Sequence, residues 1–309
     1  MPLHRKAIII ILMNRLLSTV LLVILGITVG TAQTSKVSIE GHRGARGHVP
    51  ENTIPSFTKA IDLGADTIEL DVVISKDKKV VVSHEPWFSY FISTAPDGTA
   101  ITRENEKQHN IYAMTYAEVK KYDVGSRGNV QFPQQVTMKV HKPLLSEVFV
   151  AIDRYTKSKK LPLVRYNIEI KSNEAGDGTT HPAIPEFVSL VMAEVAKYKM
   201  ANRAKIQSFD VRPLQEIKKR FPKQELALLV GTKEPIEKSM ERLGFKPESY
   251  SPHFSLVDQS VVDYCTVNKI KLVPWTVNEI ADLEKMKQFK LDGIITDYPD
   301  RAMKVFRKG

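Results

Sequence analysis

Short apolar runs rich in Val and Ile alternate with longer amphipathic segments along most of the chain. In the longer segments, apolar positions recur with helical spacing, whereas the short runs are typical of buried strands. Strands that alternate with helices in this way favour parallel β-α units over hairpins. The expected strands are 37–41, 67–73, 163–170, 204–209, 226–230, 250–253, 272–277 and 293–296, and the expected helices are 54–63, 145–157, 185–198, 212–220, 236–243, 258–268, 280–289 and 299–306.

About eight strands, each followed by a helix, predict an α/β protein with a (β/α)8 TIM barrel, a fold of typically ~250 residues. One segment interrupts the repeat. Residues 79–83 are expected to pair with the second strand as a hairpin, and residues from about 86 to 143 hold only one helical stretch, near 116–121. Because so long a connection is uncommon without a function, we expect a functional insertion that lies over the site and covers the substrate.

The N-terminal residues do not follow the alternation of strands and helices. Leu16 to Val29 is almost wholly apolar, follows Arg15 and precedes Gly30-Thr31-Ala32. This arrangement predicts a signal peptide over residues 1–32, a mature domain over 33–309, and export to the periplasm or the extracellular space. The alternative is an uncleaved anchor, although the run only approaches the ~20 residues that span a bilayer. With cleavage, no stable membrane span is expected.

Composition narrows the class of protein further. The 309 residues are 42% hydrophobic and 26% charged, and the net charge is +10, or +7 without residues 1–32. Lys and Arg are scattered among acids, so nucleic-acid binding is not expected, whereas a small anionic substrate fits the charge. The lone Cys265 lies in an apolar pattern and is expected in the core. No pattern predicts an oligomeric state.

Acidic residues stand at the ends of two expected strands. Glu69 and Asp71 are two residues apart and point to one face of their strand, and Glu169 and Lys171 repeat this spacing on the next barrel strand. Since chemistry in such barrels lies at the C-terminal ends of strands, the three carboxylates are expected to converge. Hard oxygen ligands suit Mg²⁺ or Ca²⁺. The alternative is a set of salt bridges to Lys171 and Arg43.

Two histidines follow apolar runs and precede turns. His42 lies after the first expected strand and His84 after the hairpin strand. A histidine pair near a metal ion can remove a proton from a nucleophile and protonate a leaving oxygen near neutral pH. Singly, each histidine would more often be structural, but together with the carboxylates they predict an acid-base site.

Eight short motifs, taken in order, resemble the signature of the glycerophosphodiester phosphodiesterase family, from about Ile39 to Pro299. They are Gly41-His42-Arg43-Gly44, Pro50-Glu51-Asn52-Thr53, Glu69-Leu70-Asp71, His84-Glu85-Pro86, Glu169-Ile170-Lys171, Gln207-Ser208-Phe209, Pro274-Trp275-Thr276-Val277-Asn278 and Thr296-Asp297-Tyr298-Pro299. Each motif alone is weak, whereas the ordered set is highly specific.

The resemblance implies metal-dependent hydrolysis of glycerophosphodiesters to glycerol 3-phosphate and an alcohol. By motif, it makes His42 and His84 the acid-base pair, makes Arg43 and Lys171 phosphate contacts, and assigns metal binding to Glu69, Asp71 and Glu169. It also implies a barrel with a small insertion after the second strand. One departure is Glu85, where the family usually has Asp.

Several other polar and aromatic residues have two interpretations each. Phe209 and Trp275 are either core aromatics or walls for the glycerol group, and Gln207 and Asn278 either line the pocket or satisfy backbone groups. Asn52 is expected to cap the helix that begins near residue 54.

Two rival functions stay open on the sequence. The first is a phospholipase D-type enzyme acting on lysophospholipid or sphingomyelin, for which the aromatic residues Trp87, Phe88, Tyr90 and Phe91 would bind a lipid tail. The second is a non-catalytic phosphodiester-binding protein. It is disfavoured because no histidine or carboxylate of the set is missing.

Overall fold

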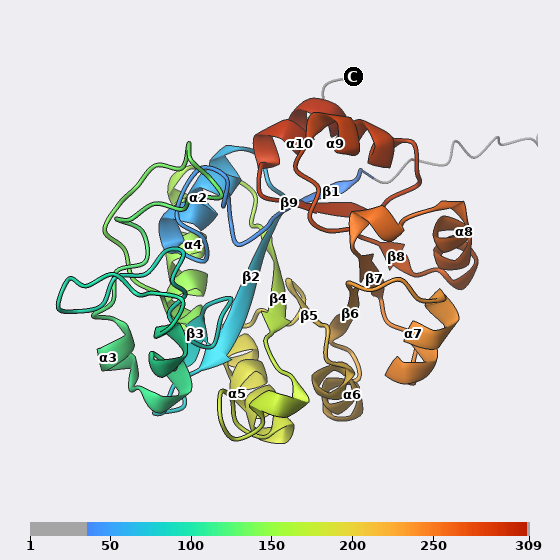
Figure 1. Ribbon diagram of the computed structural model, residues 1–309. Helices are drawn as coiled ribbons and strands as arrows, with labels where there is room; N and C mark the ends of the chain where they lie inside the picture. The colour runs from blue at the N-terminus through green and yellow to red at the C-terminus, as the bar shows by residue number, and fades with distance from the viewer. Residues whose placement is uncertain (1–35, 308–309) are drawn as a thin grey trace, which may run out of the picture. The chain divides into compact units, whose positions relative to one another are not determined.

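Eight parallel strands form the centre of the protein in a computed structural model that describes residues 36–307 (Figure 1). Each strand pairs with the next around the barrel, and β1 pairs with both β2 and β9. The (β/α)8 barrel predicted from the sequence is confirmed. The strands are, in barrel order, β8 (Lys271–Leu272), β7 (Ser249–Pro252), β6 (Glu225–Val230), β5 (Ala204–Ser208), β4 (Arg165–Ile170), β2 (Thr67–Ile74), β1 (Ser38–Gly41) and β9 (Gly293–Thr296).

The barrel closes between β8 and β9 without a regular ladder. Three backbone hydrogen bonds cross this seam, from Asp292 N to Leu272 O, from Ile295 N to Pro274 O and from Val277 N to Ile295 O. The strand expected over 272–277 is therefore only two residues long. Pro274 has no N–H to donate, which explains why regular pairing stops before it.

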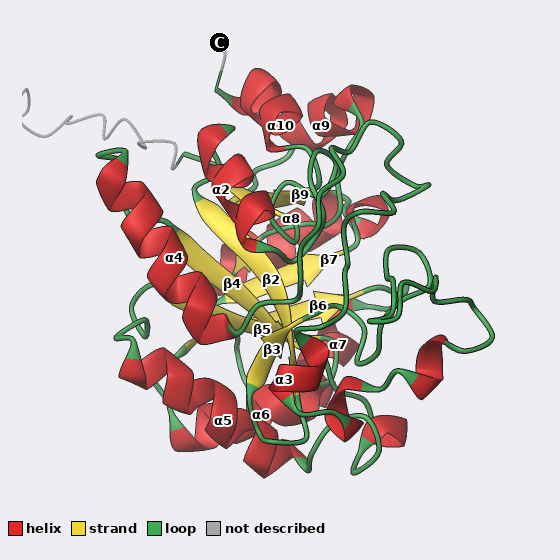
Figure 2. Cartoon of the chain, turned by 90° about the vertical axis from the view of Figure 1, so that its left-hand side faces the viewer, coloured by secondary structure: helices red, strands yellow, loops and turns green. Residues whose placement is uncertain are grey.

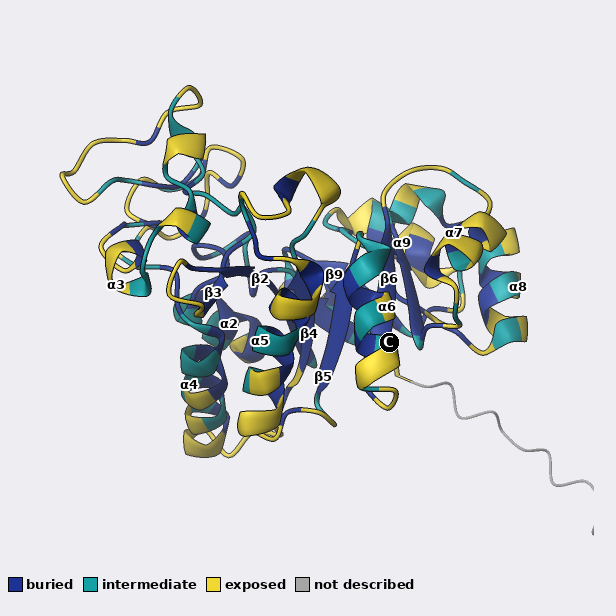
Figure 3. Cartoon of the chain, turned by 90° about the horizontal axis from the view of Figure 1, so that it is seen from below, coloured by how far each residue is buried: buried dark blue, intermediate teal, exposed yellow. Residues whose placement is uncertain are grey.

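Helices follow the strands and surround them (Figure 1). The strands are almost wholly buried, whereas the helices carry their exposed residues on the outer side (Figure 3). The two buried apolar clusters of residues 37–307 give the barrel unit its own core. The helices are α2 (Ile54–Asp62), α4 (Leu145–Ser158), α5 (Ile184–Lys197), α6 (Val211–Arg220), α7 (Ile236–Leu243), α8 (Gln259–Asn268), α9 (Ile280–Lys287) and α10 (Pro299–Phe306).

The strand β3 (Val80–Val82) pairs antiparallel with β2, as the hairpin prediction required. Beyond it, residues 86–143 run mostly as loops (Figure 2), with short 3-10 turns at Glu106–Gln108 and Ile111–Ala113 and the single-turn helix α3 (Tyr116–Val119). These loops have a hydrophobic cluster of their own, in which Phe88 stacks on Tyr122 with ring centroids 3.8 Å apart. The insertion is thus held by internal packing as well as by the barrel.

The predicted signal segment, residues 1–32, lies outside the described residues, and export stays a prediction. Within residues 36–307, no helix has both the length and the apolar character needed to cross a bilayer.

Candidate active site

Three buried carboxylates converge at the C-terminal ends of β2 and β4. Asp71 and Glu169 are partners in the β2–β4 register, and Glu69 lies two residues before Asp71 on the same side of β2. One carboxylate oxygen from each of the three lies within 4.8 Å of the others. The structure therefore brings together the three acids that the strand spacing singled out.

Hydrogen bonds fix each carboxylate in place. The backbone N–H of Arg43 and the amide Nε2 of Gln207 donate to Glu69 at 2.8 and 2.9 Å. Asn52 Nδ2 donates to Asp71 at 2.8 Å, and Lys171 Nζ lies 2.8 Å from Glu169 Oε1. These bonds come from the loop between β1 and α2, from β5 and from the loop after β4, so the cluster depends on the closed barrel.

The cluster carries more negative charge than its cations neutralise. Burial raises the pKa of Glu69 well above its usual value, and Asp71 and Glu169 raise it further. Burial also raises the pKa of Glu169 to about 7, although Lys171 opposes this rise. Asp71 Oδ1 is buried without a hydrogen-bond partner among the described residues. Because an unpartnered buried oxygen among three carboxylates is costly, the donor set fits a hard divalent cation.

The salt bridges expected as the alternative are present too. Lys171 Nζ lies 3.7 Å from Asp71 Oδ1, and Arg43 Nε lies 3.5 Å from Asp71 Oδ2. Arg43 is shared, however, because its guanidinium also donates to Glu51 at 2.7 Å. The two cations therefore flank the carboxylates without neutralising all of their negative charge.

His42 follows β1 and is oriented by the last strand of the barrel. Its Nδ1 lies 2.7 Å from Asp297 Oδ1, and Asp297 is itself held by Asn278 Nδ2 at 2.7 Å. A carboxylate on Nδ1 favours the tautomer that leaves Nε2 free to accept a proton. Burial lowers the pKa of His42, an effect that Asp297 only partly offsets, so the ring is neutral near pH 7.

His84 follows β3 and has the same arrangement, with a neighbouring acid on its Nδ1. The Glu85 carboxylate lies 2.7 Å from this nitrogen, so the longer side chain still reaches the ring. Burial lowers the pKa of His84 to about 4, and the Arg43 and Lys171 cations add to this effect. Both histidines thus offer a free Nε2 in a neutral ring.

The loop after β1 folds tightly enough to place His42 and Arg43 side by side with the carboxylates. Gly44 has a φ of +89°, and a Cβ there would lie 2.4 Å from Ser56 Oγ. Ser56 Oγ in turn donates to Arg43 O at 3.0 Å. Only glycine fits this approach of the loop to α2.

The helix cap predicted for Asn52 is wrong. Thr53 caps α2, with its side chain accepting from Ser56 N, whereas Asn52 turns away toward Asp71. The φ of Asn52 is +55°, a left-handed conformation that an N-cap residue does not adopt. Asn52 consequently belongs to the carboxylate cluster.

A cavity of about 200 Å³ opens beside the cluster and contains both histidines. Phe209 and Trp275 form one wall and meet edge to face, with ring centroids 5.3 Å apart. Trp275 Nε1 donates to Ser251 O at 2.8 Å, which fixes the indole. Gln207 lines the cavity, and its side chain bonds to the side chains of Glu69 and Asn167 instead of to backbone groups. Asn278 instead supports Asp297.

A second, wider cleft of about 470 Å³ lies next to this cavity. His84, Glu169 and Phe209 line both spaces, whereas His42 lines only the first. The rest of the cleft is formed by the insertion, including Trp87, and by the loop after β4. His84 therefore stands at the boundary between the two spaces.

Several site residues were not predicted as such from the sequence. Arg46 lines the first cavity and pairs with Glu51 at 2.8 Å, and Lys142 of the insertion is buried with its Nζ 2.7 Å from Ser83 Oγ. Asp297 was noted only as part of a motif. A signal for Asp297 was available, since it directly follows the last expected strand, next to β1 in any closed barrel.

Comparisons with known proteins agree with this geometry. The profile of the family described as "Glycerophosphoryl diester phosphodiesterase family" matches residues 42–301. The chain is 34% identical to the glycerophosphodiester phosphodiesterase of Caldanaerobacter subterraneus over 89% of this chain and 99% of the relative. A crystal structure from Silicibacter pomeroyi, described as that of a "putative glycerophosphoryl diester phosphodiesterase", superposes with a TM-score of 0.78 at 29% identity; the match covers 89% of this chain and 94% of that chain. The fold also matches an Oleispira antarctica phosphodiesterase in complex with the product sn-glycerol-3-phosphate, with a TM-score of 0.68 and 22% identity. This match covers 87% of this chain and 96% of that chain.

Proposed function

Because the chain belongs to the glycerophosphoryl diester phosphodiesterase family, we propose that His42 and His84 catalyse hydrolysis of glycerophosphodiesters to glycerol 3-phosphate and an alcohol, with a divalent cation. Membership of this family by itself makes the chain a phosphoric diester hydrolase. One observation carries the proposed mechanism: two histidines, each with a carboxylate on Nδ1, border the cavity that Glu69 and Glu169 line. The product bound in the Oleispira antarctica relative is consistent with this substrate class.

The charges around the cavity match a phosphodiester. Arg43 reaches the first cavity and Lys171 the second cleft, so a phosphoryl group at their boundary has a cation on each side. Such groups stabilise the charge that develops on the non-bridging oxygens. A divalent cation held by Glu69, Asp71 and Glu169 would add positive charge that polarises a phosphoryl oxygen.

The two histidines divide the proton transfers between them. We assign the leaving alcohol to the wider cleft and its proton to His84, because His84 borders that cleft and His42 does not. His42, held by Asp297, then accepts the proton of the nucleophile at Nε2. A bound phosphodiester brings negative charge beside His84 and thereby favours its protonated form.

The lipid-directed rival has little support from the insertion. Phe88 is fully buried and stacks on Tyr122, and Tyr90 and Phe91 pack against the same cluster. Of the four aromatic residues that would bind a lipid tail, only Trp87 lines the cleft. These side chains stabilise the insertion instead of forming an acyl groove.

Substrates whose leaving groups differ in basicity test whether His84 protonates the leaving group while His42 accepts the proton of the nucleophile. For His84→Ala, we expect hydrolysis of glycerophosphocholine to fall about 100-fold or more, and hydrolysis of a glycerophosphodiester of 4-nitrophenol to fall far less, since nitrophenolate leaves without a proton. His42→Ala should lower both rates alike. Steady-state kinetics provide the measurement, and circular dichroism checks that both variants fold. Near-normal rates for both variants would refute the mechanism, and equal losses for both substrates in His84→Ala would refute the assignment of the acid.

A further inference from the structure

The rim of the barrel opposite the active site is lined by lysines. In a parallel barrel, the loops that lead from a helix into the next strand all lie at the N-terminal end of the strands. In this chain, nearly every such loop from β4 to β9 contributes an exposed lysine. These seven rim lysines are Lys159, Lys160, Lys199, Lys223, Lys246, Lys269 and Lys290.

The acids of the same loops do not neutralise the rim lysines. Glu248 accepts from Leu226 N at 2.8 Å, and Asp292 accepts from Leu272 N at 2.9 Å, so both carboxylates fix strand entries. Other cations at this end, such as Lys271 and Arg203, do have acidic partners. Among residues 36–307, none of the seven rim lysines has a carboxylate within ion-pair distance.

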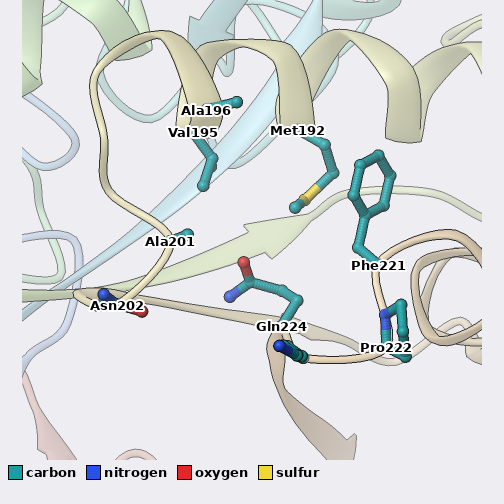
Figure 4. A pocket seen from close by; sticks show the side chains of 9 residues that line it. Met192, Val195, Ala196, Ala201, Asn202, Phe221, Pro222 and Gln224 are labelled. Atoms are coloured by element: carbon teal, nitrogen blue, oxygen red, sulfur yellow. The ribbon is translucent and has the colours of Figure 1, made fainter.

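Apolar surface lies among these lysines. A pocket of about 500 Å³ opens between the end of α5 and the entry to β6, where Met192, Val195 and Phe221 point into it (Figure 4). In the loop that enters β4, Leu161 and Leu163 are 40% and 59% exposed. Lysines around exposed apolar side chains are the chemistry by which peripheral proteins bind anionic bilayers.

We propose that this rim is a docking surface for an anionic lipid bilayer. The rim lysines approach the headgroups, and Leu161, Leu163 and the pocket between α5 and α6 face the apolar boundary below them. A bilayer is the partner favoured by the geometry, because the lysines form a ring over six loops instead of a stripe that could follow a nucleic-acid backbone.

Docking by the rim has a consequence for the active site. The carboxylates and histidines lie at the other end of the strands, so the catalytic cavity opens away from the bilayer. The chain also enters β1 at the rim, through Val37.

Vesicle binding tests the proposal without any assay of catalysis, so its outcome is independent of the proposed function. The chain is begun at Gln33 to remove the apolar run, which retains the whole described core. We expect it to sediment with vesicles of phosphatidylglycerol and phosphatidylcholine and not with pure phosphatidylcholine. Each lysine near such a surface strengthens binding about fivefold. Lys160→Gln, Lys199→Gln, Lys223→Gln and Lys246→Gln together should therefore weaken binding about 100-fold or more.

A second quadruple variant removes the same charge from the opposite end. Its four exposed lysines lie in the β2–β3 turn, the insertion and the loop after β6, and their loss should change vesicle binding less than threefold. They are Lys76, Lys121, Lys139 and Lys233, each changed to Gln. Both variants should hydrolyse a soluble substrate at the normal rate. Equal binding to neutral and anionic vesicles, no binding to either, or equal losses in the two variants would overturn the proposal.

Discussion

At the scale of single residues, the site is a set of acids whose charge exceeds what Arg43 and Lys171 neutralise. The i, i+2 spacing of Glu69 and Asp71 was enough to predict that both face one side. The sequence could not show that Asp71 Oδ1 lacks a hydrogen-bond partner among residues 36–307, because this depends on where the side chains of Asn52 and Lys171 lie in the folded chain. The missing partner is the strongest reason to expect a cation.

The raised pKa of Glu169 predicts how stability depends on pH without metal. At about 7, it exceeds the unfolded value of ~4.3, so between these values the folded chain holds a proton that the unfolded chain has released. The free energy of unfolding should therefore fall as pH rises from 5 to 7, by up to about 1.4 kcal/mol per unit from this group. Glu169→Gln should flatten that slope, as measured by urea unfolding in chelator.

Exposed Glu237 provides the matched control, and Glu237→Gln should leave the slope unchanged. Mg²⁺ or Ca²⁺ should stabilise the wild type more at pH 8 than at pH 5, since the cation competes with the proton. Chelator should abolish activity and either ion restore it. Full activity in excess chelator would count against a metal site at these carboxylates.

At the scale of elements, the loop between β1 and α2 determines whether His42 and Arg43 reach the carboxylates. Gly44→Ala should destabilise the protein by about 2–4 kcal/mol, because a left-handed φ and a clash with Ser56 both oppose a Cβ. It should also lower kcat at least tenfold, since small displacements of catalytic groups are costly. Thermal unfolding and steady-state kinetics provide the measurements.

Gly98 has nearly the same φ, +88°, but a Cβ there meets nothing within 4 Å. Gly98→Ala therefore isolates the backbone cost, about 1 kcal/mol, with normal activity. Equal effects at Gly44 and Gly98 would show that the approach to Ser56 does not matter.

The order of elements could be predicted from the sequence because each strand and helix has its own periodicity. The prediction and the structure differ where a contact with a residue distant in the sequence overrides the local pattern. Residues 272–277 have the composition of a strand, but Pro274 has no N–H to donate to a ladder. Asn52 has the residue type of a helix cap, but its side chain bonds to Asp71. The role of Asp297 depends on the pairing of β1 with β9, which no local pattern encodes.

At the scale of the whole barrel unit, the mouth, at the C-terminal ends of the strands, and the rim, at their N-terminal ends, have different surfaces. The mouth has the small cavity with both histidines and, next to it, the cleft that the insertion lines, whereas the rim has lysines and exposed leucines. A cavity of about 200 Å³ is smaller than typical drug-sized pockets, and none of the aromatic residues of the insertion lines it.

This geometry predicts a preference for water-soluble substrates. Turnover of glycerophosphocholine should exceed that of lysophosphatidylcholine at least tenfold in kcat/KM, measured by choline release. Phe88→Ala should not increase lipid turnover, because Phe88 lies inside the insertion cluster and not in the cleft. A preference for the lipid would favour the phospholipase D-type alternative instead.

The hydrogen bond between His42 and Asp297 joins residues that are 255 positions apart. During synthesis, the ribosome releases one of them long before the other exists, so no nascent or truncated chain can orient this histidine. His42 is therefore oriented for its proposed role only after β9 pairs with β1 and completes the barrel. Activity would therefore report that β9 has been made and has paired with β1.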